Sequence, residues 1–322
     1  MAFSESRQNL VKIEATRHKD GDQVGTRARH RIASVHFEGK NAVFSRLTGA
    51  IVRAILVVLL VAMPSLLLPF ASSDTTQTVT LVAIFAAAFT LFEYGSTYPS
   101  LVEFRDAPPF NRIRYLALFT TVLLLTLIAR GAVDPTKMTM LLSAIGTLIG
   151  QSIDFPYSPV RFVVLMMPPD TDAALVGQIR TAAGLSYLIS LISLAVFLIC
   201  LRLGGWPNRG STFNVWVNLP TFDPTAGSDV VERLNRDGRV NIILGFLLPF
   251  IIPTFMKLAA DLFDPITLGN SQTMIWTMTA WAFLPASLFM RGIAMGRVAQ
   301  MISDKRRQTY AAAKRDGALA PA

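Results

Sequence analysis

Long runs of apolar residues, separated by short polar segments, dominate the sequence from about residue 49 onwards. Several runs reach the ~20 residues that an α-helix needs to cross the ~30 Å hydrocarbon core of a bilayer. Each such run predicts a transmembrane helix, because a helix satisfies its backbone hydrogen bonds within its own segment. Six segments are predicted as full spans: 49–70, 79–101, 113–130, 181–201, 241–262 and 273–294.

A seventh apolar run, 138–153, is shorter than a full span. The segment that follows it contains Pro156, Pro159, Pro168 and Pro169, which no continuous helix accommodates. We therefore expect 138–168 to form a broken or re-entrant hairpin within an all-α transmembrane bundle, with seven plain spans as the alternative. Irregular backbone at membrane depth is tolerated where it is buried in protein or lines a wet cavity, so the hairpin also indicates a site.

The distribution of charge predicts the topology. Charged residues make up only 16% of the chain, against about 25% in soluble proteins. Residues 1–47 hold nine Lys/Arg against five Asp/Glu and residues 297–322 hold six against two, so the two tails carry all but one unit of the formal charge of +9. By the positive-inside rule we expect an inner-membrane protein with both termini in the cytoplasm, which requires an even number of crossings.

Three regions follow from this pattern. Residues 1–47 are expected to be a basic, mostly disordered cytoplasmic tail that ends in an interfacial lead-in. Residues 48–296 form the transmembrane domain and include an extramembrane loop at 203–240, in which "FNVWVNL" suggests a short strand. Residues 297–322 form the second basic cytoplasmic tail.

Composition and motifs argue against several classes of function. The short basic tails flank hydrophobic spans and lack the elements of a nucleic-acid-binding domain, so no nucleic-acid partner is expected. Cys200 is the single cysteine and the three histidines lie in the first tail, so we expect no disulfide, metal site or cofactor. Nucleophile-elbow, Walker and zinc-protease motifs are absent, and no enzymatic activity is expected.

Glu93 is the first candidate site residue. If the second span runs over 79–101, this carboxylate lies well inside the hydrocarbon, which makes it a site hypothesis by default. Ser96 and Tyr98, on the next turn, are candidates to hydrate or coordinate around it. In the alternative interpretation the interface begins at Tyr94 and Glu93 lies only one turn deep.

Alternating charges beside a double proline predict a rigid cytoplasmic elbow between the second and third spans. Such an elbow suits a salt-bridge network or the docking of a partner, and no companion group for catalysis is apparent. Its candidate residues are Glu103, Arg105, Asp106, Arg112 and Arg114.

Two further polar groups lie in the apolar runs. Ser143, Thr147 and Gln151 recur every four residues, with Asp154 three further on, and this stripe predicts either a solute path or helix packing.

Lys257 and Asp261 share a helix face and predict either an ion or proton relay or two side chains that reach out to the interface.

These features favour a permease or channel-like transporter of a small solute or ion, because buried ionisable groups and broken helices mark transport paths. The alternative is a non-catalytic assembly factor or accessory subunit of a larger membrane complex, which would dock through the elbow and the 203–240 loop. The expected partners are the lipid bilayer and, in the second case, other membrane subunits.

Overall fold

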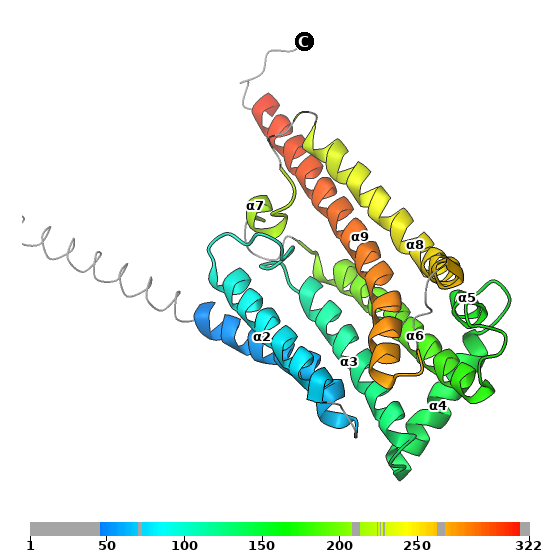
Figure 1. The fold of residues 1–322 in the computed structure, drawn as a ribbon. Coiled ribbons are helices and arrows are strands. Elements are labelled where there is room, and N and C mark those ends of the chain that lie inside the picture. Colours follow the sequence, from blue (N-terminus) through cyan, green and yellow to red (C-terminus); the bar gives the residue numbers. More distant parts are fainter. Residues whose placement is uncertain are drawn as a thin grey trace, which may run out of the picture.

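The computed structural model describes residues 46–69, 73–207, 213–223, 225, 227, 229–262 and 268–315, and within these ranges it contains helices and no strands. The side chains of residues 73 and 260–262 are outside that description, as is most of the predicted disordered tail. In chain order the helices are Arg46–Leu67, α2 (Ser73–Gly95), α3 (Phe110–Gly131), α4 (Lys137–Ile153), α5 (Pro159–Leu165), α6 (Ala173–Gly204), α7 (Val215–Asn218), α8 (Val230–Leu262) and α9 (Ser271–Arg315) (Figure 1).

Six of the described helices are long and apolar enough to cross a membrane: Arg46–Leu67, Asp74–Gly95, Phe110–Gly131, Ala173–Gly204, Val230–Ala259 and Ser271–Arg315. They coincide with the six predicted spans, so the prediction of an all-α polytopic membrane bundle is confirmed.

The segment 138–168 is broken after its apolar run, as the prolines there predicted. The helix α4 begins at a capping box, in which the Thr136 side chain accepts from the Thr139 backbone N–H and the Thr139 side chain accepts from that of Thr136. It ends at Ile153 after 17 residues, and α5 restarts with Ser158 as its cap and Pro159 in its first turn. Two short helices joined by a turn therefore precede α6.

Several predicted boundaries are wrong. The helix α2 ends at Gly95 rather than near 101, and α8 begins at Val230 rather than near 241. The predicted strand in the 203–240 loop is a single helical turn, α7, because the Asn214 side chain accepts from the backbone N–H groups of Trp216 and Val217 and so caps a helix.

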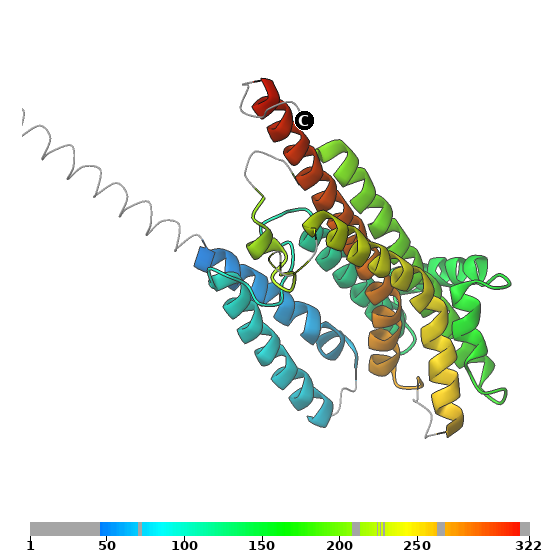
Figure 2. The same cartoon turned by 90° about the horizontal axis from the view of Figure 1, so that it is seen from above.

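The core lies where α3, α6 and α9 pack together. Val122, Leu185, Met278 and Trp281 all belong to this cluster and are almost completely buried. Leu60 and Met63 of the helix Arg46–Leu67 reach the same cluster. In Figures 1 and 2 this helix and α2 lie side by side at the edge of the bundle, away from α5 and α8. We call these two helices the edge hairpin.

Glycines allow two helix pairs to approach at backbone distance. A Cβ added to Gly184 of α6 would lie 2.6 Å from the Cα of Gly150 in α4, and one added to Gly292 of α9 would lie 2.5 Å from the carbonyl oxygen of Gly238 in α8. Small residues serve this purpose where membrane helices cross closely.

The helix α9 is 45 residues long, which corresponds to about 68 Å and exceeds the ~30 Å of hydrocarbon. The first turns of α8 run beside its far end (Figure 1). Arg306 of α9 donates to Asp229 just before α8 at 2.6 Å, and this hydrogen bond lowers the pKa of the exposed Asp229 carboxyl.

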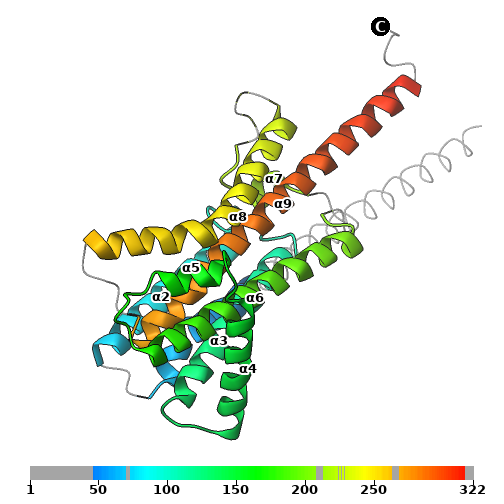
Figure 3. The same cartoon turned by 90° about the vertical axis from the view of Figure 1, so that its right-hand side faces the viewer.

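The helix α8 bends at its two internal prolines, Pro249 and Pro253. Its first half follows α9, whereas its last turns swing away from α9 and towards α5 (Figure 3). Because Pro253 has no N–H, the carbonyl of Pro249 loses its helical partner. The Trp281 indole Nε1–H of α9 donates to that buried carbonyl at 3.0 Å.

Replacing Trp281 with phenylalanine is expected to lower the free energy of unfolding by about 1–3 kcal/mol, because the Pro249 carbonyl would be buried without a donor. Thermal unfolding of the purified chain in detergent would measure the effect. Trp276→Phe on the same helix is the matched control, since the structure shows no hydrogen bond from that partly buried indole. Equal losses in the two variants would contradict a role for the indole N–H.

Candidate functional site

Glu93 lies in the last turn of α2 and organises the elbow, which we define as residues 96–109. Its fully buried carboxylate accepts from the backbone N–H groups of Ser100, Leu101 and Val102 at 3.0–3.1 Å and from the Ser100 hydroxyl. The depth of Glu93 in the membrane stays a prediction. Glu93 lines none of the cavities described below.

Arg105 closes the other side of the elbow. Its guanidinium donates to the carbonyls of Glu93 (2.9 Å), Ser96 (2.8 Å) and Thr97 (3.3 Å), and it forms an ion pair with Asp106 (3.2 Å). The first of these acceptors belongs to the C-terminal turn of α2, where a cation satisfies carbonyls that have no helical partner. The Arg105 side chain is 7% exposed, so this contact is structural.

Glu103 joins the elbow to α9. Both of its carboxylate oxygens accept from Arg291, at 2.6 and 2.8 Å, and the Thr221 hydroxyl donates to one of them at 2.8 Å. Arg291 also donates to Asn241 of α8 at 3.0 Å. Glu103 of the elbow, Thr221, Asn241 of α8 and Arg291 of α9 therefore meet in one network, so four segments are joined. A salt-bridge network was predicted for the elbow, but its partners were not.

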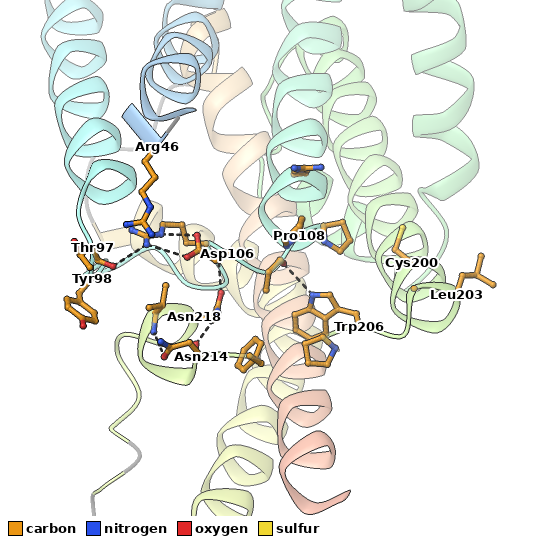
Figure 4. A pocket seen from close by; sticks show the side chains of 18 of the residues that line it. Arg46, Thr97, Tyr98, Asp106, Pro108, Cys200, Leu203, Trp206, Asn214 and Asn218 are labelled. Carbon is orange, nitrogen blue, oxygen red and sulfur yellow. Dashed lines mark hydrogen bonds and ion pairs between the residues drawn. The ribbon is translucent and has the colours of Figure 1, made fainter. Parts of the chain in front are cut away.

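The 213–223 segment packs onto the elbow. The Asn218 carbonyl accepts from the Phe104 N–H at 2.7 Å and its side-chain oxygen accepts from the Asp106 N–H at 3.1 Å. Trp206 donates to the Ala107 carbonyl at 3.4 Å. Figure 4 shows Asp106, Asn218 and Asn214 grouped on one side of the cavity of about 760 Å³ at this junction, with Trp206 across from them. Tyr98, which is 71% exposed, and Arg112 also line it.

A larger cavity of about 1180 Å³ lies between the edge hairpin, α3, α8 and α9, on the inner side of the elbow. We call it the arginine cavity, because Arg53, Arg112, Arg114 and Arg291 line it. Its remaining wall is mainly apolar, with Val52, Leu56, Phe89, Leu248, Leu284 and Leu288 among the lining residues. Of the predicted elbow residues, Glu103, Arg112 and Arg114 are therefore brought together here.

A third cavity, of about 640 Å³, lies beside the C-terminal end of α3 and the N-terminal end of α9. We call it the hydroxyl cavity. The predicted stripe of Ser143, Thr147 and Gln151 lines it from α4, and Thr181 faces it from α6, with 3.4 Å between the Thr147 and Thr181 hydroxyls. The stripe thus faces a cavity, while Gly146 and Gly150 of the same helix provide the packing.

Asp154 does not continue the stripe into that cavity. Its carboxylate forms ion pairs with Arg161 of α5 at 2.9 Å and Arg180 of α6 at 2.8 Å, and its side chain is 5% exposed. The two arginines tie the turn after α4 to the helices that follow it.

Lys257 donates to the Leu165 carbonyl at 3.2 Å and so attaches the bent end of α8 to α5. The side chain of Asp261 lies outside the described part of the structure, and the predicted pair stays a prediction.

A closed layer separates the arginine and hydroxyl cavities. Along α3 it extends from Tyr115 to Leu125, and along α9 from Leu284 to Met274, which is about 15 Å of helix in each case. Val122 fills it without measurable exposure.

The hydroxyls of Ser186 in α6 and Thr279 in α9 are buried in this layer and have no hydrogen-bond partner among the described residues. Ser186 forms a stripe with Ser190 and Ser193 of α6, a pattern that favours helix packing and, as the alternative, a solute path. Nothing in the sequence distinguishes Thr279, because an isolated Thr in an apolar helix ordinarily bonds to its own backbone.

No family model, no curated protein and no solved structure matches this chain. Function is therefore inferred from the geometry of these cavities.

Proposed function

We propose that this polytopic membrane protein is a permease-type carrier of a small solute, in which the arginine and hydroxyl cavities are two entrances to a site in the closed layer. The supporting observation is that the two cavities lie at opposite ends of α3 and at two levels of α9, the hydroxyl cavity at its N-terminal end and the arginine cavity beside its middle turns. Two vestibules separated by a thin closed layer are what alternating access requires.

The unpaired hydroxyls of Ser186 and Thr279 support the position of the site. A buried polar group without a partner costs about 1–3 kcal/mol, so its presence in a native core calls for an explanation such as a bound water or solute. In this proposal the solute supplies the missing partner as it crosses the layer.

The proposed orientation follows from the basic tails. With both termini in the cytoplasm of an inner-membrane protein, the elbow and the arginine cavity face the cytoplasm and the hydroxyl cavity faces outside. The Ser143–Thr147–Gln151 stripe then belongs to the outer entrance. Glu93 and Lys257 act as structural attachments in this scheme and not as parts of the path.

Side-dependent cysteine labelling tests the proposal. In a Cys200→Ala background, Ser287→Cys reports on the arginine cavity, Ser143→Cys on the hydroxyl cavity and Thr279→Cys on the closed layer. A small membrane-impermeant thiol reagent is applied to right-side-out and inside-out vesicles. We expect Ser287→Cys to react from the cytoplasmic face, Ser143→Cys from the outer face, and Thr279→Cys slowly from both.

Thr126→Cys is the matched control for burial. Thr126 is fully buried in α3, donates to the Val122 carbonyl at 2.6 Å and lines none of the three cavities, so it should not react. If Thr279→Cys stays as unreactive as Thr126→Cys from both faces, the layer does not open and the carrier proposal fails.

One observation favours the alternative of an accessory subunit. Phe85 and Phe92 of α2 are 68% and 65% exposed, and the described contacts of α2 with α3 to α9 are sparse. Such a face suits another membrane subunit as well as lipid. A stable partner that co-purifies in mild detergent and is lost in a Phe85→Ala, Phe92→Ala variant, together with an unreactive Thr279→Cys, would favour this second function.

A further inference from the structure

The arginine cavity carries an excess of positive charge. Four arginines line it, whereas Glu103 is the one carboxylate among its described lining residues, and Glu103 is already occupied by Arg291. Arg53, Arg112 and Arg114 thus remain without a carboxylate partner in the described part of the chain. Uncompensated cations are costly at the edge of a hydrocarbon region, so the cavity is built for an anion.

Arg114 is the most constrained of the three. Its guanidinium lies over the ring of Phe110 at 5.1 Å and that of Phe283 at 5.7 Å, and its one described hydrogen bond to a side chain, to Asn111, is long at 3.3 Å. The buried Nε–H has no partner among the described residues. A guanidinium held between aromatic rings with a free donor is positioned to bind an oxyanion.

Arg53 approaches the same place from the edge hairpin. Its guanidinium donates to the Gly49 carbonyl at 2.8 Å and lies 4.6 Å from the centre of the Tyr94 ring. Arg53 and Arg114 thus line the same cavity from two different helices, with Tyr94 also in its wall. Arg112 is exposed and has no described hydrogen bond or ion pair, so its side chain is available at the rim.

The rest of the cavity is apolar and extends along the helices towards the middle of the membrane. Val52, Phe89 and Leu284 line it and are still 52%, 43% and 53% exposed, so its wall is continuous with the lipid-facing surface of the bundle. A small hydrophilic anion would leave this wall unused. An amphiphile, with an anionic head at the arginines and a chain along the wall, would fill both parts.

From this combination we propose that the arginine cavity binds an anionic phospholipid, with its phosphate held by Arg53, Arg112 and Arg114 and an acyl chain against Val52, Phe89 and Leu284. This inference names a ligand of the inner entrance and so rests on the proposed function for the identity of that entrance, although binding can be measured without any transport. Phosphate oxygens match the planar guanidinium in a bidentate manner, and three of the four lining arginines form no ion pair with a described carboxylate.

Native mass spectrometry of the purified full-length chain in detergent tests the proposal. The probes are phosphatidylglycerol, phosphatidylcholine with matched chains, and inorganic phosphate. We expect phosphatidylglycerol to bind at least roughly tenfold more tightly than phosphatidylcholine, and Arg114→Gln to weaken it by roughly tenfold or more, as the loss of a charge-assisted hydrogen bond does.

Two further variants keep the outcome decisive. Arg112→Gln changes an exposed side chain without described contacts, so it tests the site even if Arg114→Gln fails to fold. Arg130→Gln removes an exposed arginine at the other end of α3 and should leave binding unchanged. Equal binding of the two lipids, or equal losses with Arg112→Gln and Arg130→Gln, would overturn the inference.

The source of the phosphate is settled by the third probe. If inorganic phosphate binds at the same arginines as tightly as phosphatidylglycerol does, the ligand is a soluble phosphate and the lipid assignment is overturned. Specific lipid binding combined with an unreactive Thr279→Cys would support the lipid site and contradict the carrier function. Side-dependent labelling without lipid binding would support the carrier function and contradict the lipid site.

Discussion

Replacing Glu103 with alanine is expected to lower the free energy of unfolding by about 3 kcal/mol. Removal of one partner from a buried ion pair costs about 3–5 kcal/mol because the other charge stays desolvated. The effect falls at the low end of that range, since the Arg291 side chain retains 30% exposure while that of Glu103 retains 11%. Chemical or thermal unfolding in detergent, followed by tryptophan fluorescence, would measure the loss.

Asp134→Ala is the control for the Glu103 prediction. Asp134 pairs with Arg130 at 3.7 Å, but both side chains are well exposed, and such pairs contribute about 0–1 kcal/mol. The double variant Glu103→Ala, Arg291→Ala should lose less than the sum of the two single changes, because it leaves no unpaired charge. Additive losses, or equal losses for Glu103→Ala and Asp134→Ala, would show that the network does not hold the elbow to α9.

Replacing Gly184 with alanine is expected to destabilise the chain by about 1–3 kcal/mol, the cost of overpacking a close contact. The added Cβ would lie 2.6 Å from the Cα of Gly150, and two backbones cannot yield as a flexible side chain can. The helix α4 would have to move away from α6, which would also widen the hydroxyl cavity. Unfolding experiments and faster labelling of Ser143→Cys would report the two consequences separately.

Gly177→Ala, on the same helix, is the matched control. Nothing lies within 4 Å of a Cβ at that position, so the change should raise helix stability by about 0.5–1 kcal/mol. A Gly184→Ala variant as stable as Gly177→Ala would mean that the close approach of α4 and α6 is not required.

The sequence was sufficient for the fold because hydrocarbon thickness sets a length that apolar runs must meet. The helix ends were harder to predict, since hydropathy locates the part of a helix inside the membrane and is silent on its extension into water. The first turns of α8 contain Glu232, Arg233, Arg236, Asp237 and Arg239, and such residues form helices readily outside lipid. The prediction therefore placed them in the 203–240 segment and did not join them to the span that begins near 241.

The sequence indicated which charged residues belong to the candidate site, but it did not indicate which groups these residues contact. Glu93 is bound by backbone N–H groups seven to nine residues ahead, which no pattern of side chains reveals. Glu103 and Arg291 are 188 positions apart, so no spacing in the sequence pairs them. The charge excess of the arginine cavity appears once helices from both ends of the chain are packed together.

The length of α9 has a mechanical consequence. By length, more than half of this helix extends beyond the hydrocarbon. The first turns of α8 run beside it and form a two-helix stalk. The two helices are in close contact at Gly238 and Gly292, and Arg306 of α9 donates a hydrogen bond to Asp229. The same rigid helix carries Arg291 and Leu284 in the wall of the arginine cavity. A partner that binds and tilts the stalk in the aqueous phase would therefore also move Arg291 and Leu284. It would change the width of the arginine cavity without contacting it.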